Sequence, residues 1–220
     1  MMKNLALAGT SVLMSFVLVA CSHQSTARRA QPQTVYSDYD TAINGRFALF
    51  VDTAAMARDP EFKWSGCDAY TIKLSADVAM RETLLATLKK IVRDSDLVEA
   101  PIAPSDLAAA GFDGMIVVEI DEYSVEVDAS SAWISTDLTA DAELQLSYKV
   151  DVAGGRRSGA SFIEAAGSHT GPLGVMCSGA GEVAAGAVEK AMASIAAKAS
   201  ERISNSSRLR DEFRTSPTTD

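Results

Sequence analysis

The sequence predicts an α+β fold, a two-layer sandwich in which two main helices pack on one face of a mainly antiparallel sheet with a long β-hairpin. Three observations predict it: a long alternation of apolar and polar residues, a glycine pair that ends it, and two segments with apolar residues at helical spacing. Strand runs mixed with helices that cover one side of the sheet are typical of this class.

The longest predicted strand covers residues 138–152. Its alternate positions are apolar, namely Leu138, Ala140, Ala142, Leu144, Leu146, Tyr148, Val150 and Val152. A period of two places these side chains on one face of a strand about 50 Å long, at roughly 3.3 Å per residue. Gly154 and Gly155 supply a hairpin turn, and residues 157–169 return as the partner strand. The hairpin therefore has one dry and one wet face.

The remaining strands are shorter or less regular. Residues 46–52 and 70–74 are predicted strands, and residues 96–99 a short one. Residues 115–127 form another long strand, whose alternation shifts near Asp121 and Glu122, so we expect a β-bulge there.

Two main helices are predicted. The first covers residues 76–93, with Ser75 as its N-cap, Asp77 in its first turn and an apolar face of Val78, Leu84, Leu85, Leu88, Ile91 and Val92. Residues 104–110 form one or two helical turns closed by Gly111. The second main helix has apolar residues at four-residue steps, so we expect it on the dry face of the sheet: Val183, Ala187, Ala191, Ile195, Ala199 and Ile203.

The first 21 residues indicate where in the cell the protein is located. Lys3 precedes an apolar run from Leu5 to Ala20, which is typical of a secretory signal peptide. That run is shorter than the roughly 20 residues that span a bilayer. An uncleaved anchor and cleavage without lipid attachment remain as alternatives.

The last four of these residues, Leu18-Val19-Ala20-Cys21, resemble the lipobox of bacterial lipoproteins. The resemblance implies that Cys21 becomes a lipid-bearing N-terminus, held in the membrane by several acyl chains. Ser22, in place of an aspartate, implies the outer membrane with the domain facing the periplasm. We therefore expect a signal peptide over 1–20, a flexible tether over 21–40, a single domain over 41–204 and a disordered tail over 205–220.

Two cysteines remain if Cys21 is acylated. Cys67 and Cys177 are expected to form a disulfide in the oxidising periplasm, with two separately buried thiols as the alternative. Closing a loop of about 110 residues would contribute on the order of 4–5 kcal/mol. No metal site is predicted, because the two histidines, His23 and His169, stand far apart and no metal-ligand spacing occurs.

The charge of the chain disfavours a nucleic-acid partner. Residues 1–20 contain one lysine and no acidic residue, so the remaining 200 residues carry 19 basic and 29 acidic side chains, a net charge of −10. Such a surface gains nothing from phosphates and gives no electrostatic help toward anionic lipid. The predicted membrane attachment therefore depends on the lipid.

No catalytic or cofactor motif stands out. Gly179-x-Gly181-x-x-Ala184 lacks the following strand of a dinucleotide site and is better explained by close helix packing. Ser168 and His169 are strand neighbours whose side chains point to opposite faces. A general acid–base pair needs two carboxylates brought together in a cleft, and the sequence favours no such pair over solvent-exposed positions. The carboxylates considered are Asp94, Asp96, Glu119, Asp121, Glu122, Glu126 and Asp128.

Two arginines and two tryptophans have two interpretations each. Arg156 and Arg157 at the hairpin tip either contact phosphate groups or acidic partners, or merely solubilise the turn, which we favour. Trp64 and Trp133 are interface aromatics or, as we favour, packing residues.

The order of elements and the Cys21 region resemble small envelope lipoproteins of lipopolysaccharide assembly, ABC-type lipid transport and exopolysaccharide secretion. The resemblance implies a non-enzymatic accessory subunit, without a cofactor, that docks on an envelope assembly or transport complex. A periplasmic module that binds a lipid or glycan between sheet and helices is the alternative, and a cell-wall hydrolase is a third.

Overall fold

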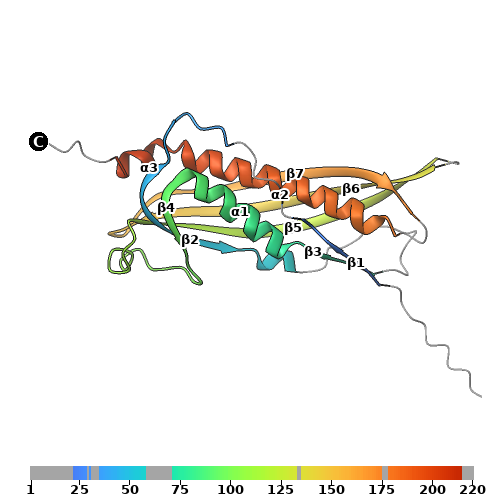
Figure 1. Cartoon of the computed structure of the whole chain (residues 1–220), viewed down its shortest axis with the longest axis horizontal. Helices are drawn as coiled ribbons and strands as arrows, with labels where there is room; N and C mark the ends of the chain where they lie inside the picture. The colour runs from blue at the N-terminus through green and yellow to red at the C-terminus, as the bar shows by residue number, and fades with distance from the viewer. Residues whose placement is uncertain are drawn as a thin grey trace, which may run out of the picture.

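The structure is a computed structural model that describes residues 22–28, 30, 35–57, 71–132, 135–174 and 178–214. Helices α1 (Asp77–Ile91) and α2 (Ala180–Ser204) pack side by side on one face of a five-stranded sheet, as Figure 1 shows. The predicted α+β class, with two main helices on a sheet that contains a long hairpin, is confirmed.

The sheet is mixed, and the antiparallel part is the longer one. Its strands lie in the order β4, β2, β5, β6, β7. β2 pairs in parallel with β4 and β5, whereas β5, β6 and β7 pair antiparallel. Parallel neighbours need a crossover connection, and α1 lies in the one between β2 and β4. The bounds are β2 Ile43–Asp52, β4 Val92–Leu97, β5 Gly114–Ala132, β6 Ser135–Val152 and β7 Arg156–Pro172.

The two irregularities of the long strands were predictable. The register of β5 and β6 shifts between Ile120 and Glu122, where the alternation predicts a bulge. Gly154 and Gly155 form the β6–β7 turn with φ of +91° and +88°, values that residues with a Cβ rarely adopt. The bulge keeps the apolar positions before and after it, Ile120 and Val125, on the helix side of the sheet.

The helix side of the sheet carries the main core. The apolar positions of β6 are buried here against α2, which crosses β6 and β7 (Figure 1). Contact is closest at Gly167, where an added Cβ would overlap the backbone of α2 at Ala187 and Ala191. Small residues on both elements thus let a helix backbone lie directly on a strand.

Helix α1 differs from its prediction in detail. It begins at Asp77 with Ala76 as N-cap and no side-chain cap, so the predicted capping by Ser75 is wrong. Of the predicted apolar face, Leu84, Leu88, Ile91 and Val92 are buried, whereas Val78 is 62% exposed and Met80 is buried in the first turns. A single residue at the end of a helix contributes too little to the periodicity to fix the phase.

In the described part of the chain, the opposite, outer face of the sheet is covered from Gly114 to Val118, within the stretch where β2 pairs with β5. We call this part the proximal half and the continuation of β5, β6 and β7 from Glu119 onward the distal half. Hydrogen-bonded turns within residues 98–113, rather than the helical turn predicted at 104–110, cover the proximal half. They form a second, smaller apolar cluster with the sheet, made of Ala48, Leu107, Met115 and Val117.

The segment predicted as a tether contains structure. β1 (Ser22–Thr26) pairs in parallel with β3 (Thr71–Ser75), and both lie apart from the main sheet. Further on, the amide of Asp38 donates to Asn205 Oδ1 at 2.8 Å, and Asn205 Nδ2 donates to the Tyr36 carbonyl at 3.1 Å. The polar side chain of Asn205, directly after α2, thus satisfies a backbone whose own sequence shows no apolar period.

The segment predicted as a disordered tail begins with a helix. α3 (Ser207–Glu212) is capped by Ser206, whose hydroxyl accepts from the Leu209 amide at 3.3 Å. Leu209 is buried, and the ring of Phe213 lies 4.8 Å from that of Phe47, centroid to centroid. Two apolar residues four positions apart are enough to fix this short helix on the end of the core.

Candidate docking face

The residues predicted for lipid attachment and cross-linking lie outside the described part of the chain. They are Cys21, Cys67 and Cys177, and Trp64 and Trp133 also lie outside it. Lipidation at Cys21, the disulfide and the roles of the two tryptophans therefore stay predictions.

The two motifs that we interpreted as packing features do contact the helix layer. His169 lies against Gly186 of α2, where an added Cβ would press on the imidazole ring, while the neighbouring Ser168 is exposed on the other face. At the start of α2, a Cβ on Gly179 would overlap the carbonyl oxygen of Pro172. Ala184 is fully buried. Both places serve the close approach of α2 to β7.

The arginines at the hairpin tip are engaged within the chain. Arg156 forms an ion pair with Glu212 of α3 at 2.8 Å, and Arg157 with Asp151 at 3.2 Å. Asp151 is buried, so its partner compensates a charge removed from water. These contacts support a structural role for both arginines.

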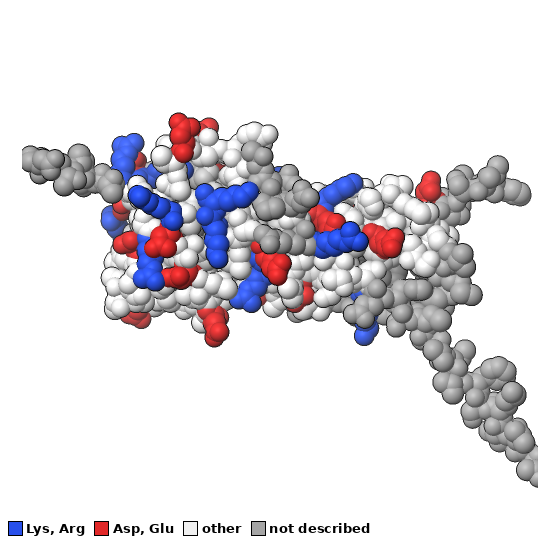
Figure 2. Space-filling view, in the orientation of Figure 1, with Lys and Arg blue, Asp and Glu red and all other residues white. Residues whose placement is uncertain are grey.

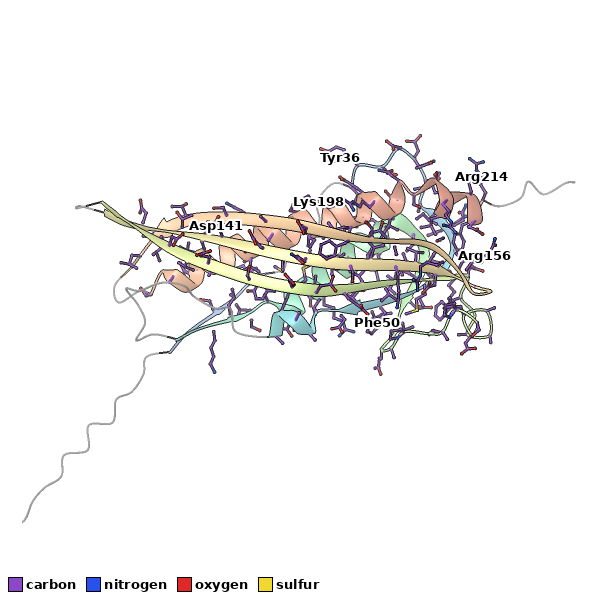
Figure 3. The ribbon with its side chains drawn as sticks, turned by 180° about the vertical axis from the view of Figure 1, so that it is seen from behind. Tyr36, Phe50, Asp141, Arg156, Lys198 and Arg214 are labelled. Carbon is purple, nitrogen blue, oxygen red and sulfur yellow. The ribbon has the colours of Figure 1, made fainter. Side chains whose placement is uncertain are left out.

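The distal half of the outer face is acidic on all three strands. Cross-strand register places their polar positions in rows, so that Glu122 faces Gln145 and Gln145 faces Glu164. Figure 3 looks onto this side of the sheet, with Asp141 labelled on it. We define the distal outer face by its nine carboxylates: Glu119, Asp121, Glu122, Glu126, Asp128, Asp137, Asp141, Glu143 and Glu164.

Positive charge is scarce on this face. Among the described residues of the three strands, two basic side chains stand at outward positions, Lys149 opposite Val117 and Arg157 opposite Asp151, and both lie on the proximal half. The helix side is different, since Figure 2 shows Lys and Arg interspersed with Asp and Glu over its visible surface. The two sides of the layered domain therefore differ strongly in charge.

The distal outer face also carries apolar surface and a hollow. Phe162, on β7 opposite Ser147, is 47% exposed. A hollow of about 210 Å³ lies nearby, beside Ala166, whose small side chain leaves space between its neighbours. Its lining consists of Glu143, Leu144, Gln145, Glu164, Ala165, Ala166 and Lys198.

The open edge of β7 is protected by α2. Three basic side chains of the helix reach over this edge and donate hydrogen bonds to carbonyl oxygens that face away from β6. These bonds join Lys190 to Ser168 at 2.7 Å, Lys198 to Glu164 at 2.9 Å and Arg202 to Phe162 at 2.9 Å. Covering an edge in this way opposes pairing with another strand.

A second hollow lies at the α3 end of the domain. It measures about 130 Å³, and Arg210, Arg214, Tyr39 and Asn44 contribute to its lining. Arg210 donates to the carbonyls of Ser204 at 2.6 Å and Thr41 at 2.8 Å and lies over the Tyr39 ring. Burial lowers the pKa of this guanidinium, and its interaction with Tyr39 opposes the shift. Arg210 therefore joins α2, α3 and residues 39–41.

Within the described ranges, no group of His, Cys, Asp and Glu side chains is arranged to hold a metal ion. None of the described helices is long and apolar enough to cross a membrane.

The sequence contained a signal for the acidic face that motif searching misses. We weighed the carboxylates of β5 as catalytic pairs, yet the polar positions of the 138–152 alternation already place Asp141 and Glu143 on the wet side. What periodicity does not give is the pairing of β5, β6 and β7. Register alone brings the carboxylates of three strands onto one surface.

No family model matches the chain, and a search of curated proteins finds no relative. Among solved structures, protein XCC0632 from Xanthomonas campestris, described as DUF330, is similar with a TM-score of 0.50 and 10% identity over 89% of this chain and 100% of that one. A minor lipoprotein from Acinetobacter baumannii matches at a TM-score of 0.35 and 12% identity, over 72% of this chain and 90% of its own. The likeness to XCC0632 is one of fold.

Proposed function

We propose that the chain is a non-enzymatic lipoprotein of the bacterial outer membrane that acts as an accessory or docking subunit of an envelope assembly or transport complex. The observation that carries the proposal is the distal outer face, a broad sheet surface that no other described segment covers, while the opposite surface is buried under two helices. The lipobox-like Leu18 to Cys21 supports the membrane attachment.

The alternative of a lipid or glycan bound between sheet and helices receives less support. Buried side chains of both layers, among them Leu144, Met192 and Ile195, fill that space in the described chain. The two hollows described above lie elsewhere, on the outer face and beside α3. A ligand between the layers would have to displace core side chains, and tight interiors resist this.

The test is crosslinking of the native protein in its membranes, followed by affinity purification and identification of what is attached. Recovery in a defined protein complex, together with an intact mass that shows acylation at Cys21, supports the proposal. Consistent recovery as a lone monomer overturns the docking role. A free Cys21 thiol, or a retained leader, overturns the anchor.

A further inference from the structure

The nine carboxylates of the distal outer face are spread over three adjacent strands. Neighbouring strands lie about 4.8 Å apart, so that each carboxylate is within a Debye length of several others at physiological salt. Gathering like charges in this way raises the free energy of the fold. On the helix side, by contrast, Lys and Arg alternate with Asp and Glu over the visible surface (Figure 2).

We propose that the distal outer face binds a lysine- and arginine-rich surface of a partner protein. The inference rests on the docking function proposed above and names the surface and the chemistry of its partner. Charge complementarity carries it, because seven carboxylates remain on this part of the sheet even without Glu126 and Asp137, which already interact within the chain. Lys149 and Arg157, the basic side chains at outward positions of the described strands, lie on the proximal half. Complementary charge of this kind steers association and selects among partners.

The hollow beside Ala166 suits a basic side chain. Glu143 and Glu164 stand on two adjacent strands at its rim, and Ala166 leaves room for an alkyl stem between them. An arginine or lysine of the partner can lay its methylenes on Ala166 and direct its charge to both carboxylates. Lys198 also lines the hollow, but its ammonium is bonded to the Glu164 carbonyl at 2.9 Å.

Phe162 offers an apolar contact next to this hollow on the same strand face. Interfaces commonly combine an exposed aromatic anchor with a surrounding polar rim. The open surface covers on the order of 500 Å², which is at the small end for a specific interface. We therefore expect a salt-sensitive complex.

Other occupants of this face are disfavoured by the same charges. Anionic lipid and nucleic acid are repelled by it. A second copy of this chain would oppose carboxylates to carboxylates, and its β7 edge is already covered by Lys190, Lys198 and Arg202. A cationic protein surface is the occupant that the charge favours.

The test uses the full lipidated chain in non-ionic detergent and two charge-reversal variants of equal net charge. Asp141→Lys with Glu143→Lys alters the distal outer face, and Glu82→Lys with Glu182→Lys alters exposed positions on the helix side. The probe is a fluorescent oligolysine peptide, and binding is measured by anisotropy. We expect the outer-face pair to weaken binding by about tenfold or more and the helix-side pair to change it little.

Equal losses in both variants would show an effect of net charge alone and overturn the proposal. Because lysine substitutions in a strand can disturb folding, Asp141→Asn with Glu143→Gln provides a neutral pair, and urea midpoints verify that each variant is folded. The neutral pair should weaken peptide binding in the same direction. Unchanged binding by a folded neutral or reversed pair contradicts the proposal.

A second experiment separates this inference from the docking function. A photocrosslinker replaces Ser124 on the distal outer face or Ser194 on α2 in cells. Adducts that form from position 124, map to lysine- and arginine-rich peptides of one protein and vanish in the Asp141→Lys, Glu143→Lys background support the inference. Adducts to that protein only from position 194 overturn it and leave the docking function standing. Adducts to a second copy or to lipid overturn it too, and the absence of any protein adduct overturns both.

Discussion

The proximal and distal halves of the outer face share the same three long strands, yet in the described part of the chain one is covered and the other is open. In the proximal half, residues 98–113 lie over Met115 and Val117 and bury them. In the distal half, the corresponding outward positions of β5 carry Glu122, Glu126 and Asp128. The covered half has a core on both sides of the sheet, whereas the open half has one on its helix side only.

The difference separates two uses of a strand pattern. Where a strand is apolar at successive positions, as at residues 115–118, both faces are buried. Where it alternates strictly, one face stays in water. The distal half therefore depends for its stability on the contact with α2, and its outer face is free to serve binding. Four changes test this comparison.

The largest effect is expected from Leu107→Ala, which truncates the fully buried side chain at the centre of the proximal cluster. Loss of this contact and the resulting cavity should lower the free energy of unfolding by about 2–4 kcal/mol. Phe162→Ala, on the open half, is the matched control and should cost less than about 1 kcal/mol. Urea denaturation measures both, and similar costs would contradict the distinction between the halves.

Gly167→Ala tests the claim that the distal half is held from its helix side. The added methyl would overlap backbone atoms of α2 at Ala187 and Ala191, so α2 must shift, at a cost of about 1–3 kcal/mol. Gly159→Ala, on the same strand with nothing within 4 Å of the new Cβ, should be nearly neutral. Thermal unfolding distinguishes them. A neutral Gly167→Ala would mean that α2 does not lie against the strand.

Arg210→Ala probes the proximal end, where one guanidinium holds the end of α2 to residues 39–41. Loss of its bonds to the carbonyls of Ser204 and Thr41 should lower stability by about 1–2 kcal/mol. It should also speed amide hydrogen exchange in α3. Arg208→Ala, on the exposed side of the same helix, is the control. Equal exchange in both variants would argue against this role.

Tyr123→Phe gives the smallest effect at neutral pH and a distinct one in alkali. Burial raises the pKa of the Tyr123 hydroxyl well above its ordinary value, and this group finds no hydrogen-bond partner in the described structure. Above a pH of about 10 the unfolded chain ionises at this tyrosine while the folded one does not. The folded state therefore loses stability as the pH rises.

The phenylalanine variant should be as stable as the parent at pH 7, or more stable by up to about 1 kcal/mol. Its stability should fall less steeply above pH 10. Tyr148→Phe is the comparison, because an interaction with Arg202 and a hydrogen bond with Ser161 offset part of the effect of burial on its pKa. Parallel pH profiles for parent and Tyr123→Phe would show that the hydroxyl is not shielded from water.

Local patterns predicted the helix layer and the hairpin but not the parallel part of the sheet. The alternation of residues 138–152 and the glycines at 154 and 155 are properties of adjacent residues, and both predictions are confirmed. The parallel pairing of β2 with β4 and β5 depends on contacts far apart in sequence, which no period encodes. Most contacts that hold the two ends of the domain in place also join residues that are far apart in sequence.

Two errors have the same physical origin. Residues 205–214 are polar overall, and the apolar content that orders them comes from Leu209 and Phe213 alone, which pack onto partners such as Phe47. Residues 35–41 are ordered by the polar side chains of Glu201 in α2 and of Asn205 directly after it. In both cases the partner lies more than 160 positions away in the chain, so composition alone suggests disorder.

The position of β1 affects how the protein would stand on a bilayer. β1 begins at Ser22, and shortly after it the Arg28 amide donates to Glu189 in α2 at 2.7 Å. A diacylglycerol on the preceding cysteine would leave almost no slack chain between lipid and body. The domain would then be held close to the membrane in a preferred orientation. The 25-residue helix α2 is about 37 Å long and would set the distance between the membrane-proximal end of the domain and α3.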